Sequence, residues 1–141
     1  MDDSRFKILL VLQLCAAAGL LTFMIFGSGE WNAQRWAGLL IAIPATVLLF
    51  VARFQLGRSF AVRAEAHELV THGIYSKIRN PIYVFSALLV LALALTLQRP
   101  ALLFFLLVLI PVQIIRARRE AAVLEAKFGD EYRLYRQHTW F

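Results

Sequence analysis

The sequence has little charge and almost no cysteine for its length. Of its 141 residues, 17% are charged and 60% are apolar, whereas an average soluble domain has about 25% charged and about 45–50% apolar residues. A soluble domain of this size keeps about a third of its unfolded surface in water, and that surface needs polar side chains. The composition therefore argues against a soluble enzyme. The single cysteine, Cys15, has no intrachain partner, which argues against a secreted disulfide scaffold.

Several common site patterns are also missing. Gly27 and Gly29 end an apolar stretch and do not join a strand to a helix, so the sequence has no phosphate-cradling dinucleotide loop. No group of cysteines and histidines has the spacing of metal ligands, and no Ser-His-Asp arrangement is apparent. We therefore expect neither a Rossmann-type enzyme nor a metal site, and serine hydrolysis has little support.

Long stretches without Asp, Glu, Lys or Arg dominate what is present. They cover residues 8–29, 36–52, 80–98 and 100–115, and each is close to the ~20 residues (range ~17–25) that cross a bilayer as a helix. The sequence predicts an all-α polytopic membrane bundle that forms a single domain over residues 1–141. Its expected parts are spans at about 7–28, 36–53, 81–98 and 100–116, a cytoplasmic loop at 54–80 and a cytoplasmic tail at 117–141.

The net charge of +6 could suggest a nucleic-acid partner, but the positions of the basic residues point to a membrane. Only Arg35 and Arg99, of the 15 basic residues, fall in the two short loops. All the others precede the first span, lie between the second and third, or follow the fourth. By the positive-inside rule, both termini are cytoplasmic, and in a bacterium the membrane would be the cell's inner membrane. We expect no nucleic-acid partner.

The tail has the pattern of two helices joined by a glycine. Residues 115–128 contain no Gly or Pro, so we expect the fourth helix to continue past the membrane as far as Gly129, a residue type suited to the left-handed position that ends a helix. We expect Asp130 to cap a short helix over about 131–137, with Tyr132 and Tyr135 on one side. Such an elbow would fold an aromatic flap back towards the membrane. The alternative is an amphipathic tail that lies on lipid.

Two blocks of the sequence carry a family resemblance. The first contains Leu69-Val-Thr-His-Gly-Ile-Tyr75 and Arg79-Asn80-Pro81-Ile-Tyr83, and the second contains Glu120-Ala-Ala-Val-Leu124 and Phe128-Gly-Asp-Glu-Tyr132-Arg-Leu-Tyr135. One helical hairpin separates them. This pattern resembles the signatures of the isoprenylcysteine carboxyl methyltransferase and phospholipid methyltransferase families, which are integral membrane enzymes that use S-adenosylmethionine.

The resemblance implies methyl transfer from S-adenosylmethionine to a small lipophilic or lipid-linked acceptor held in membrane lipid. It also implies catalytic roles for Arg79 and Glu120. The cofactor-binding residues that it implies are His72, Gly73, Tyr75, Arg79, Asn80, Pro81, Tyr83, Glu120 and Tyr132. A carboxylate or thiolate acceptor needs no general base, which favours an acceptor that is already anionic.

Two departures from the family pattern leave other readings open. Asn80 replaces the histidine of the Arg-His-Pro signature, and Ala121 replaces the second glutamate of the pair. Because Asn cannot titrate, a step that needs an imidazole there is in doubt. A non-catalytic binding module of the same fold, or a membrane reductase of the steroid-reductase type that uses NADPH, remain alternatives. The sequence names neither the acceptor nor the oligomeric state.

Structural roles also remain open for the individual site residues. Arg79 can anchor the membrane interface, and Tyr75 and Tyr83 can belong to an interfacial aromatic belt. Glu120 lies near Arg116 and Arg119 along the expected helix, so a structural ion pair competes with a ligand contact.

Overall fold

The computed structural model describes residues 3–27, 29–57 and 69–141. Residues 58–68, which make up part of the expected central loop and include the basic residues Arg58 and Arg63, lie outside the described residues.

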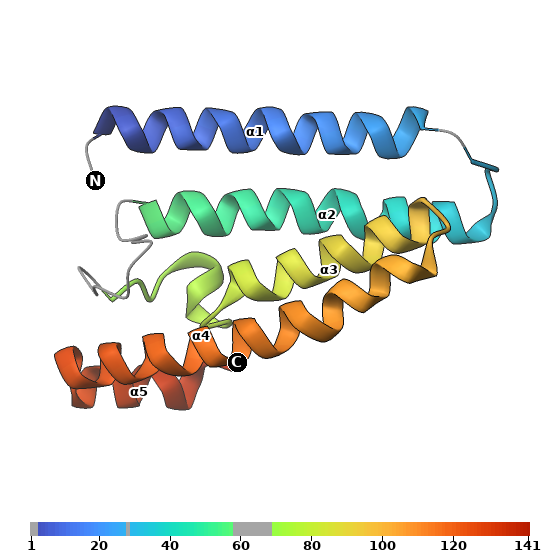
Figure 1. The fold of residues 1–141 in the computed structure, drawn as a ribbon. Helices are drawn as coiled ribbons and strands as arrows, with labels where there is room; N and C mark the ends of the chain where they lie inside the picture. The colour runs from blue at the N-terminus through green and yellow to red at the C-terminus, as the bar shows by residue number, and fades with distance from the viewer. Residues whose placement is uncertain (1–2, 28, 58–68) are drawn as a thin grey trace.

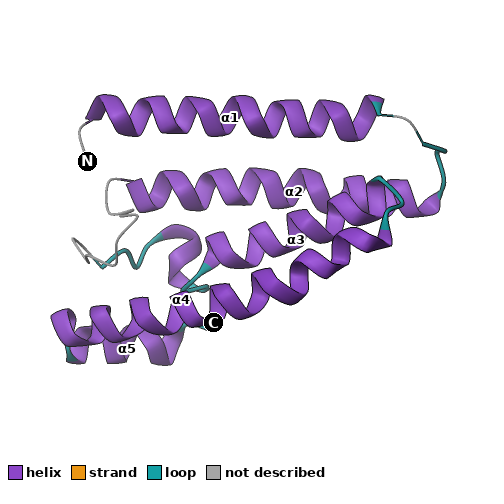
Figure 2. Cartoon of the chain, in the orientation of Figure 1, coloured by secondary structure: helices purple, strands orange, loops and turns teal. Residues whose placement is uncertain are grey.

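The described chain is a bundle of helices (Figures 1 and 2). The elements are α1 (Asp3–Phe26), α2 (Ala33–Leu56), the 3-10 helix η2 (Gly73–Ser76), α3 (Pro81–Thr96), the 3-10 helix η3 (Pro100–Leu103), α4 (Phe104–Phe128) and α5 (Asp130–His138). Within the described ranges, pairing of the strand type is limited to one parallel bridge between Ile78 and Trp140. The expected all-α fold is confirmed.

The outside of the bundle is apolar, as a lipid-facing surface requires. Phe104, Leu107 and Val108 on α4 are each about two-thirds exposed or more, and Leu40 on α2 is similarly exposed. Large contiguous apolar patches of exposed side chains are rare on soluble monomers. By length and composition, α2 and the continuous segment Pro100–Phe128 can each cross a membrane, and Val11–Phe26 and Pro81–Thr96 are shorter apolar helices. Four crossings remain a prediction.

The tightest packing joins α2 to α3. A buried cluster contains Leu39 and Ala42 of α2, Ala92 of α3 and Met24 of α1. A Cβ at Gly38 would collide with the Thr96 side chain and lie 2.9 Å from the carbonyl oxygen of Ala92. The two backbones approach so closely because small residues face one another.

Arg35, at the start of α2, holds the preceding turn. Its guanidinium is buried and donates to the carbonyl oxygens of Met24, Ile25, Gly27 and Gly29 at 2.7–3.1 Å. These carbonyls belong to the end of α1 and the residues after it, where a helix leaves acceptors unpaired and carries partial negative charge. Arg35 therefore neutralises the end of α1 and fixes its angle to α2.

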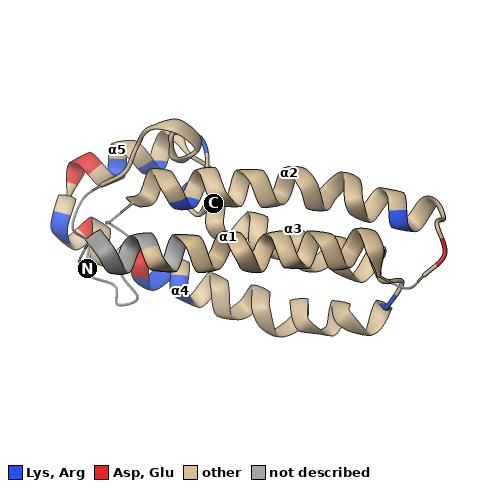
Figure 3. Ribbon diagram, turned by 90° about the horizontal axis from the view of Figure 1, so that it is seen from above, with Lys and Arg blue, Asp and Glu red and all other residues tan. Residues whose placement is uncertain are grey.

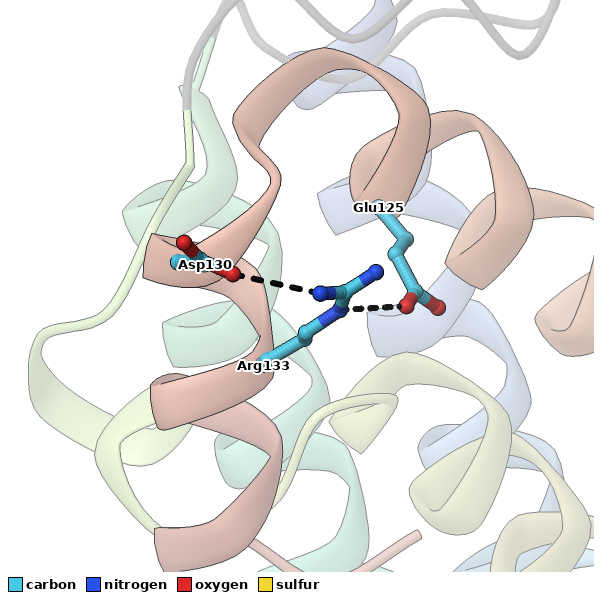
Figure 4. A network of polar contacts seen from close by, with 3 residues as sticks. All are labelled: Glu125, Asp130 and Arg133. Atoms are coloured by element: carbon cyan, nitrogen blue, oxygen red, sulfur yellow. Dashed lines mark hydrogen bonds and ion pairs between the residues drawn. The ribbon is translucent and has the colours of Figure 1, made fainter.

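Helix α5 folds back beside the end of α4 (Figure 1). The elbow is Gly129, whose φ of +53° is positive as expected, although its ψ of −120° lies outside the left-handed helical region. The expectation that Asp130 caps the short helix is wrong, because Gly129 occupies the cap position and α5 begins at Asp130 itself. The Asp130 carboxylate instead accepts from Arg133, which also pairs with Glu125 of α4 (Figure 4).

Charge is unevenly distributed along the bundle. Figure 3 shows most of the charged residues at the end that carries the N-terminus and α5, with few at the opposite end. The central blocks of the helices are free of Lys, Arg, Asp and Glu in this view. The two blocks that resemble the methyltransferase signatures both lie towards the charged end.

Candidate functional site at the charged end of the bundle

The first motif block is held against the end of α2. Gln55 of α2 accepts a hydrogen bond from the backbone N–H of Ile74 at 2.9 Å. Gly73 has a φ of +61°, and a Cβ there would collide with the Gln55 side chain. Glycine is thus needed at position 73 both for its backbone conformation and for close approach to α2. The sequence indicated close approach to a ligand, and the neighbour that the structure shows is Gln55.

Tyr75 connects this block to the core and to the tail. Its ring is buried with Ala52 and Val70, and its carbonyl oxygen accepts from the Tyr135 hydroxyl at 2.7 Å. Burial is the main cause that raises the pKa of Tyr75 well above its usual value, so the phenol stays neutral. Among the described residues, the buried Tyr75 hydroxyl has no hydrogen-bond partner. A donor is therefore available at this position.

Tyr83 and Glu120 join the two motif blocks directly. The Tyr83 hydroxyl, on α3, donates to Glu120 Oε1, on α4, at 2.5 Å. The guanidinium carbon of Arg116 lies 5.8 Å from the centre of the Tyr83 ring, at the outer limit for a cation–π contact. A phenol, a carboxylate and a guanidinium thus gather where α3 and α4 face each other.

A second polar pair lies about one helical turn after Tyr83 on α3 and about two turns before Glu120 on α4, and the sequence did not single it out. Gln113 Nε2 donates to Ser86 Oγ at 2.8 Å, and the Ser86 hydroxyl donates to the Tyr83 carbonyl oxygen. Gln113 is 8% exposed. The sequence did contain an indication of this pair, since Gln113 is the one polar side chain in the charge-free stretch at 100–115. Pairing in a bilayer stabilises such a group, because lipid offers no hydrogen bonds.

The tail covers the first motif block from outside. Tyr132 of α5 is buried and its ring centre is 6.1 Å from that of Tyr135. Beyond α5, the backbone runs parallel to residues 77–80: Trp140 N–H donates to Lys77, and Trp140 accepts from Arg79 N–H. We call residues 139–141 the tail strap. Tyr135 and the strap were not among the expected site residues, yet they make the contacts that hold the tail on the motif.

The remaining expected site residues surround this strap. Arg79 is half-buried, and its Nε has no hydrogen-bond partner among the described residues. Asn80 precedes α3, where its side chain makes no capping bond, and its N–H donates to the Phe141 carbonyl oxygen at 3.0 Å. Pro81 is buried at the first turn of α3.

His72 is the expected site residue that lies apart. Its side chain is exposed ahead of η2 and makes no capping bond there. No contact recorded within the described ranges links its imidazole to Glu120 or Tyr83. The structure thus brings together Tyr75, Tyr83, Arg79, Glu120 and Tyr132 at one end of the bundle.

A small cavity opens beside the Tyr83–Glu120 pair. It has a volume of about 150 Å³ and lies between α3 and α4. Its lining is Tyr83, Val84, Ala87, Ile110, Gln113, Ile114 and Phe141. Nearly all of this lining surface is apolar. The polar cluster and an apolar space therefore share one residue, Tyr83.

Comparison with known proteins identifies the family of this chain. The family model described as phospholipid methyltransferase matches residues 33–131, a range that begins with α2 and contains the motif loop, the α3–α4 hairpin and the Gly129 elbow. No match is found among curated proteins. Because the family match covers well over half of the chain, and the fold is the expected helical membrane bundle, this chain belongs to the phospholipid methyltransferase family.

Proposed function

We propose that this protein transfers a methyl group from S-adenosylmethionine to a lipophilic or lipid-linked acceptor at the charged end of the bundle. The observation that carries the proposal is the 2.5 Å hydrogen bond between Tyr83 and Glu120. It joins two motif blocks that are far apart in the sequence and places a carboxylate beside an apolar cavity. Family membership supports methyl transfer in a membrane. The identity of the methyl donor and the class of the acceptor go beyond family membership and are part of the proposal.

The polar groups present suit S-adenosylmethionine, which supplies the activated methyl group when it is bound. Its ammonium and ribose hydroxyls need acceptors, which Glu120 offers. Its carboxylate needs donors, and both Arg79 Nε and the Tyr75 hydroxyl are buried without a partner within the described part of the chain. The rings of Tyr75, Tyr83 and Tyr132 can face the sulfonium by cation–π contact, worth about 0.5–2 kcal/mol each.

The same geometry favours an acceptor that is already an anion. Glu120 contacts the cavity wall through Tyr83, and its Oε1 already accepts a short hydrogen bond from the Tyr83 hydroxyl. An amine or hydroxyl acceptor needs a base, and Glu120 would then have to take up a proton while it also accepts from Tyr83. A carboxylate or thiolate acceptor needs no base, and the reaction then depends on holding donor and acceptor in line in a dry site.

The test is calorimetric titration of S-adenosylmethionine into the protein in lipid nanodiscs. We expect saturable binding to the natural chain. The variants Glu120→Ala and Arg79→Ala should bind about tenfold or more weakly, the equivalent of one charge-assisted hydrogen bond. Glu125→Ala is the matched control, since Glu125 lies on the same helix but pairs with Arg133 outside the cluster. It should bind like the natural chain.

The outcomes separate the alternatives. Binding together with methyl transfer into a lipid extract supports the proposed enzyme. Binding without transfer would support a non-catalytic module, for which the departures at Asn80 and Ala121 are the motivating observation. A folded protein that binds NADPH but not S-adenosylmethionine would overturn the proposal in favour of a reductase.

A further inference from the structure

The apolar cavity between α3 and α4 has a wall that does not belong to either helix. Phe141 is the lining residue that comes from the tail strap, whereas the other lining residues come from α3 and α4. Backbone hydrogen bonds hold the strap against residues 77–80, at 3.0 Å from Trp140 N–H to Lys77 and 3.0 Å from Asn80 N–H to Phe141. The strap thus places Phe141, an aromatic residue, against the cavity.

The contents of the cavity follow from its lining. Gln113 is the one amide in the wall, and its Nε2 is already bonded to Ser86. The rest of the wall is apolar, and an apolar cavity of about this volume admits a compact apolar group such as benzene. The pocket is partly open, so an apolar group can enter it and gain van der Waals contacts with the lining atoms.

The position of the cavity, next to the Tyr83–Glu120 pair, indicates which apolar group would occupy it. Tyr83 forms part of the cavity wall and at the same time donates to Glu120. An apolar group in the cavity therefore places whatever is attached to it beside the polar cluster. The methyl acceptor needs such an arrangement, since its reactive end must meet the donor while its apolar part stays out of water.

We propose that Phe141 determines which acceptors fit: the strap places its ring as one wall of the subsite for the apolar group of the acceptor. This inference rests on the proposed function and adds to it a size limit and the residue that sets it. The expected acceptor has a compact apolar group, comparable to a short chain or a single ring, next to its anionic end.

The wall that Phe141 forms can be altered by substitution without disturbing the core. Phe141 is 38% exposed and has a φ of +43°, a left-handed conformation that is unfavourable for residues other than glycine. The buried clusters of the bundle contain Met24, Leu39 and Tyr75 and do not include Phe141. Substitution of Phe141 should therefore alter the cavity while the helices stay packed.

The test uses two photoreactive probes of different length on the full chain in nanodiscs. They are pentanoic acid and decanoic acid, each with an alkyl diazirine near its methyl end, and the crosslinked residues are mapped by mass spectrometry. In the natural chain, we expect pentanoic acid to label residues 84–87 and 110–114 in preference to decanoic acid. In Phe141→Ala, the ratio should move towards decanoic acid by about tenfold or more, the discrimination that one methylene gives in a tight apolar pocket.

Two further variants complete the test. Trp140→Ala removes an exposed ring from the same strap and does not touch the cavity lining, so it should label like the natural chain. Ala87→Leu fills the cavity from its α3 side and should reduce labelling by both probes. An unchanged ratio in Phe141→Ala, or the same change in Trp140→Ala, would overturn the proposal.

Titration of S-adenosylmethionine into the same samples separates the two proposals. Size-selective labelling without S-adenosylmethionine binding would overturn the proposed function and leave an apolar subsite governed by Phe141. If S-adenosylmethionine binds but the ratio of labelling by the two probes is the same in Phe141→Ala as in the natural chain, the proposed subsite is overturned and the proposed function stays intact.

Discussion

At the scale of single residues, Arg35 shows how a buried charge can be satisfied without a carboxylate. Its side chain is 2% exposed, and its partners are four backbone carbonyl oxygens together with the ring of Trp31, whose centre lies 4.4 Å from the guanidinium carbon. Hydrogen bonds to a charged group contribute more than neutral ones. The planar fork of an arginine suits several acceptors at once, whereas a lysine ammonium offers a single point of attachment.

We therefore expect Arg35→Ala to lower the free energy of unfolding by about 3 kcal/mol, because several buried carbonyls lose their charged donor. Arg35→Lys should recover only part of that loss. Thermal unfolding in detergent, followed by circular dichroism, measures both changes. Arg99→Ala is the control, since Arg99 is exposed at the same end of the bundle and should change stability by no more than about 0.5 kcal/mol. Equal effects at both positions would contradict the role assigned to Arg35.

A second residue-scale prediction concerns pH and Tyr135. Burial, followed by the charge of Tyr132, raises the pKa of Tyr135 to about 12, against an opposing effect of Arg79; an unfolded tyrosine ionises near pH 10. Because the folded pKa is the higher one, folding favours the neutral phenol. The stabilisation from Tyr135 is fully present below about pH 10 and is lost as the pH rises towards 12.

The expected consequence is that α5 separates from the motif loop between about pH 10 and 12, because an ionised Tyr135 can no longer donate to the Tyr75 carbonyl. Ultraviolet absorbance of tyrosinate and near-ultraviolet circular dichroism follow the change. In Tyr135→Phe, the tail contact should already be weakened at neutral pH and one titrating group should disappear. Identical titration curves for the two proteins would rule out this assignment.

At the scale of helices, the approach of α2 to α3 depends on Gly38. In the sequence, Gly38 and Ala42 have the spacing of a weak helix-association pattern. The structure shows that both residues are buried within the chain, where α2 faces Ala92 and Thr96 of α3. The pattern did indicate helix packing, but it could not tell an internal partner from a second copy.

We expect Gly38→Ala to destabilise the bundle by about 1–3 kcal/mol, because the added Cβ would lie 2.6 Å from the Thr96 backbone nitrogen and force α2 away from α3. Gly19→Ala is the matched control on α1, where a Cβ would meet nothing within 4 Å. That change should be neutral or should stabilise by up to about 1 kcal/mol, since glycine is unfavourable inside a helix. Denaturation of both variants in the same detergent measures the two changes in the free energy of unfolding. An unchanged free energy of unfolding in Gly38→Ala would contradict the close packing of α2 against α3.

At the scale of the whole molecule, the sequence predicted the helices well because charge and helix breakers mark their ends. Pro81 and Pro100 begin α3 and η3, and Gly129 separates α4 from α5. The exception was Asp130, where the expected cap became the first residue of α5, since Gly129 had already taken the cap position. Such one-residue ambiguity is common when a glycine and an acidic residue stand together at a helix boundary.

The candidate site was only partly predictable, because spacing along one helix says nothing about which helix faces it. The resemblance pointed to Tyr83 and Glu120 separately, and the structure shows that they are bonded to each other. Gln113 and Phe141 were not expected, since the cavity that they line exists only once α3, α4 and the strap are brought together. Which residues share a cavity is a property of tertiary packing and not of local pattern.

The orientation of the whole bundle gives the last prediction. Most charged residues lie at the end with the N-terminus and α5 (Figure 3), and the excess of basic residues there predicts that this end faces the cytoplasm. Glu131 on α5 and Glu30 in the α1–α2 turn are exposed and lie towards opposite ends. Because Cys15 is the one natural cysteine, its replacement by serine leaves a clean background in which Glu131→Cys and Glu30→Cys can each be labelled.

A membrane-impermeant maleimide applied to intact bacterial cells should label Glu30→Cys directly and Glu131→Cys only after lysis. The reason is physical: translocating the many basic side chains near α5 is far less favourable than translocating the short loops that hold Arg35 and Arg99. Labelling of Glu131→Cys in intact cells would reverse the orientation. It would also place the Tyr83–Glu120 cluster on the outer side, away from a donor made in the cytoplasm, so the same result would count against the proposed function.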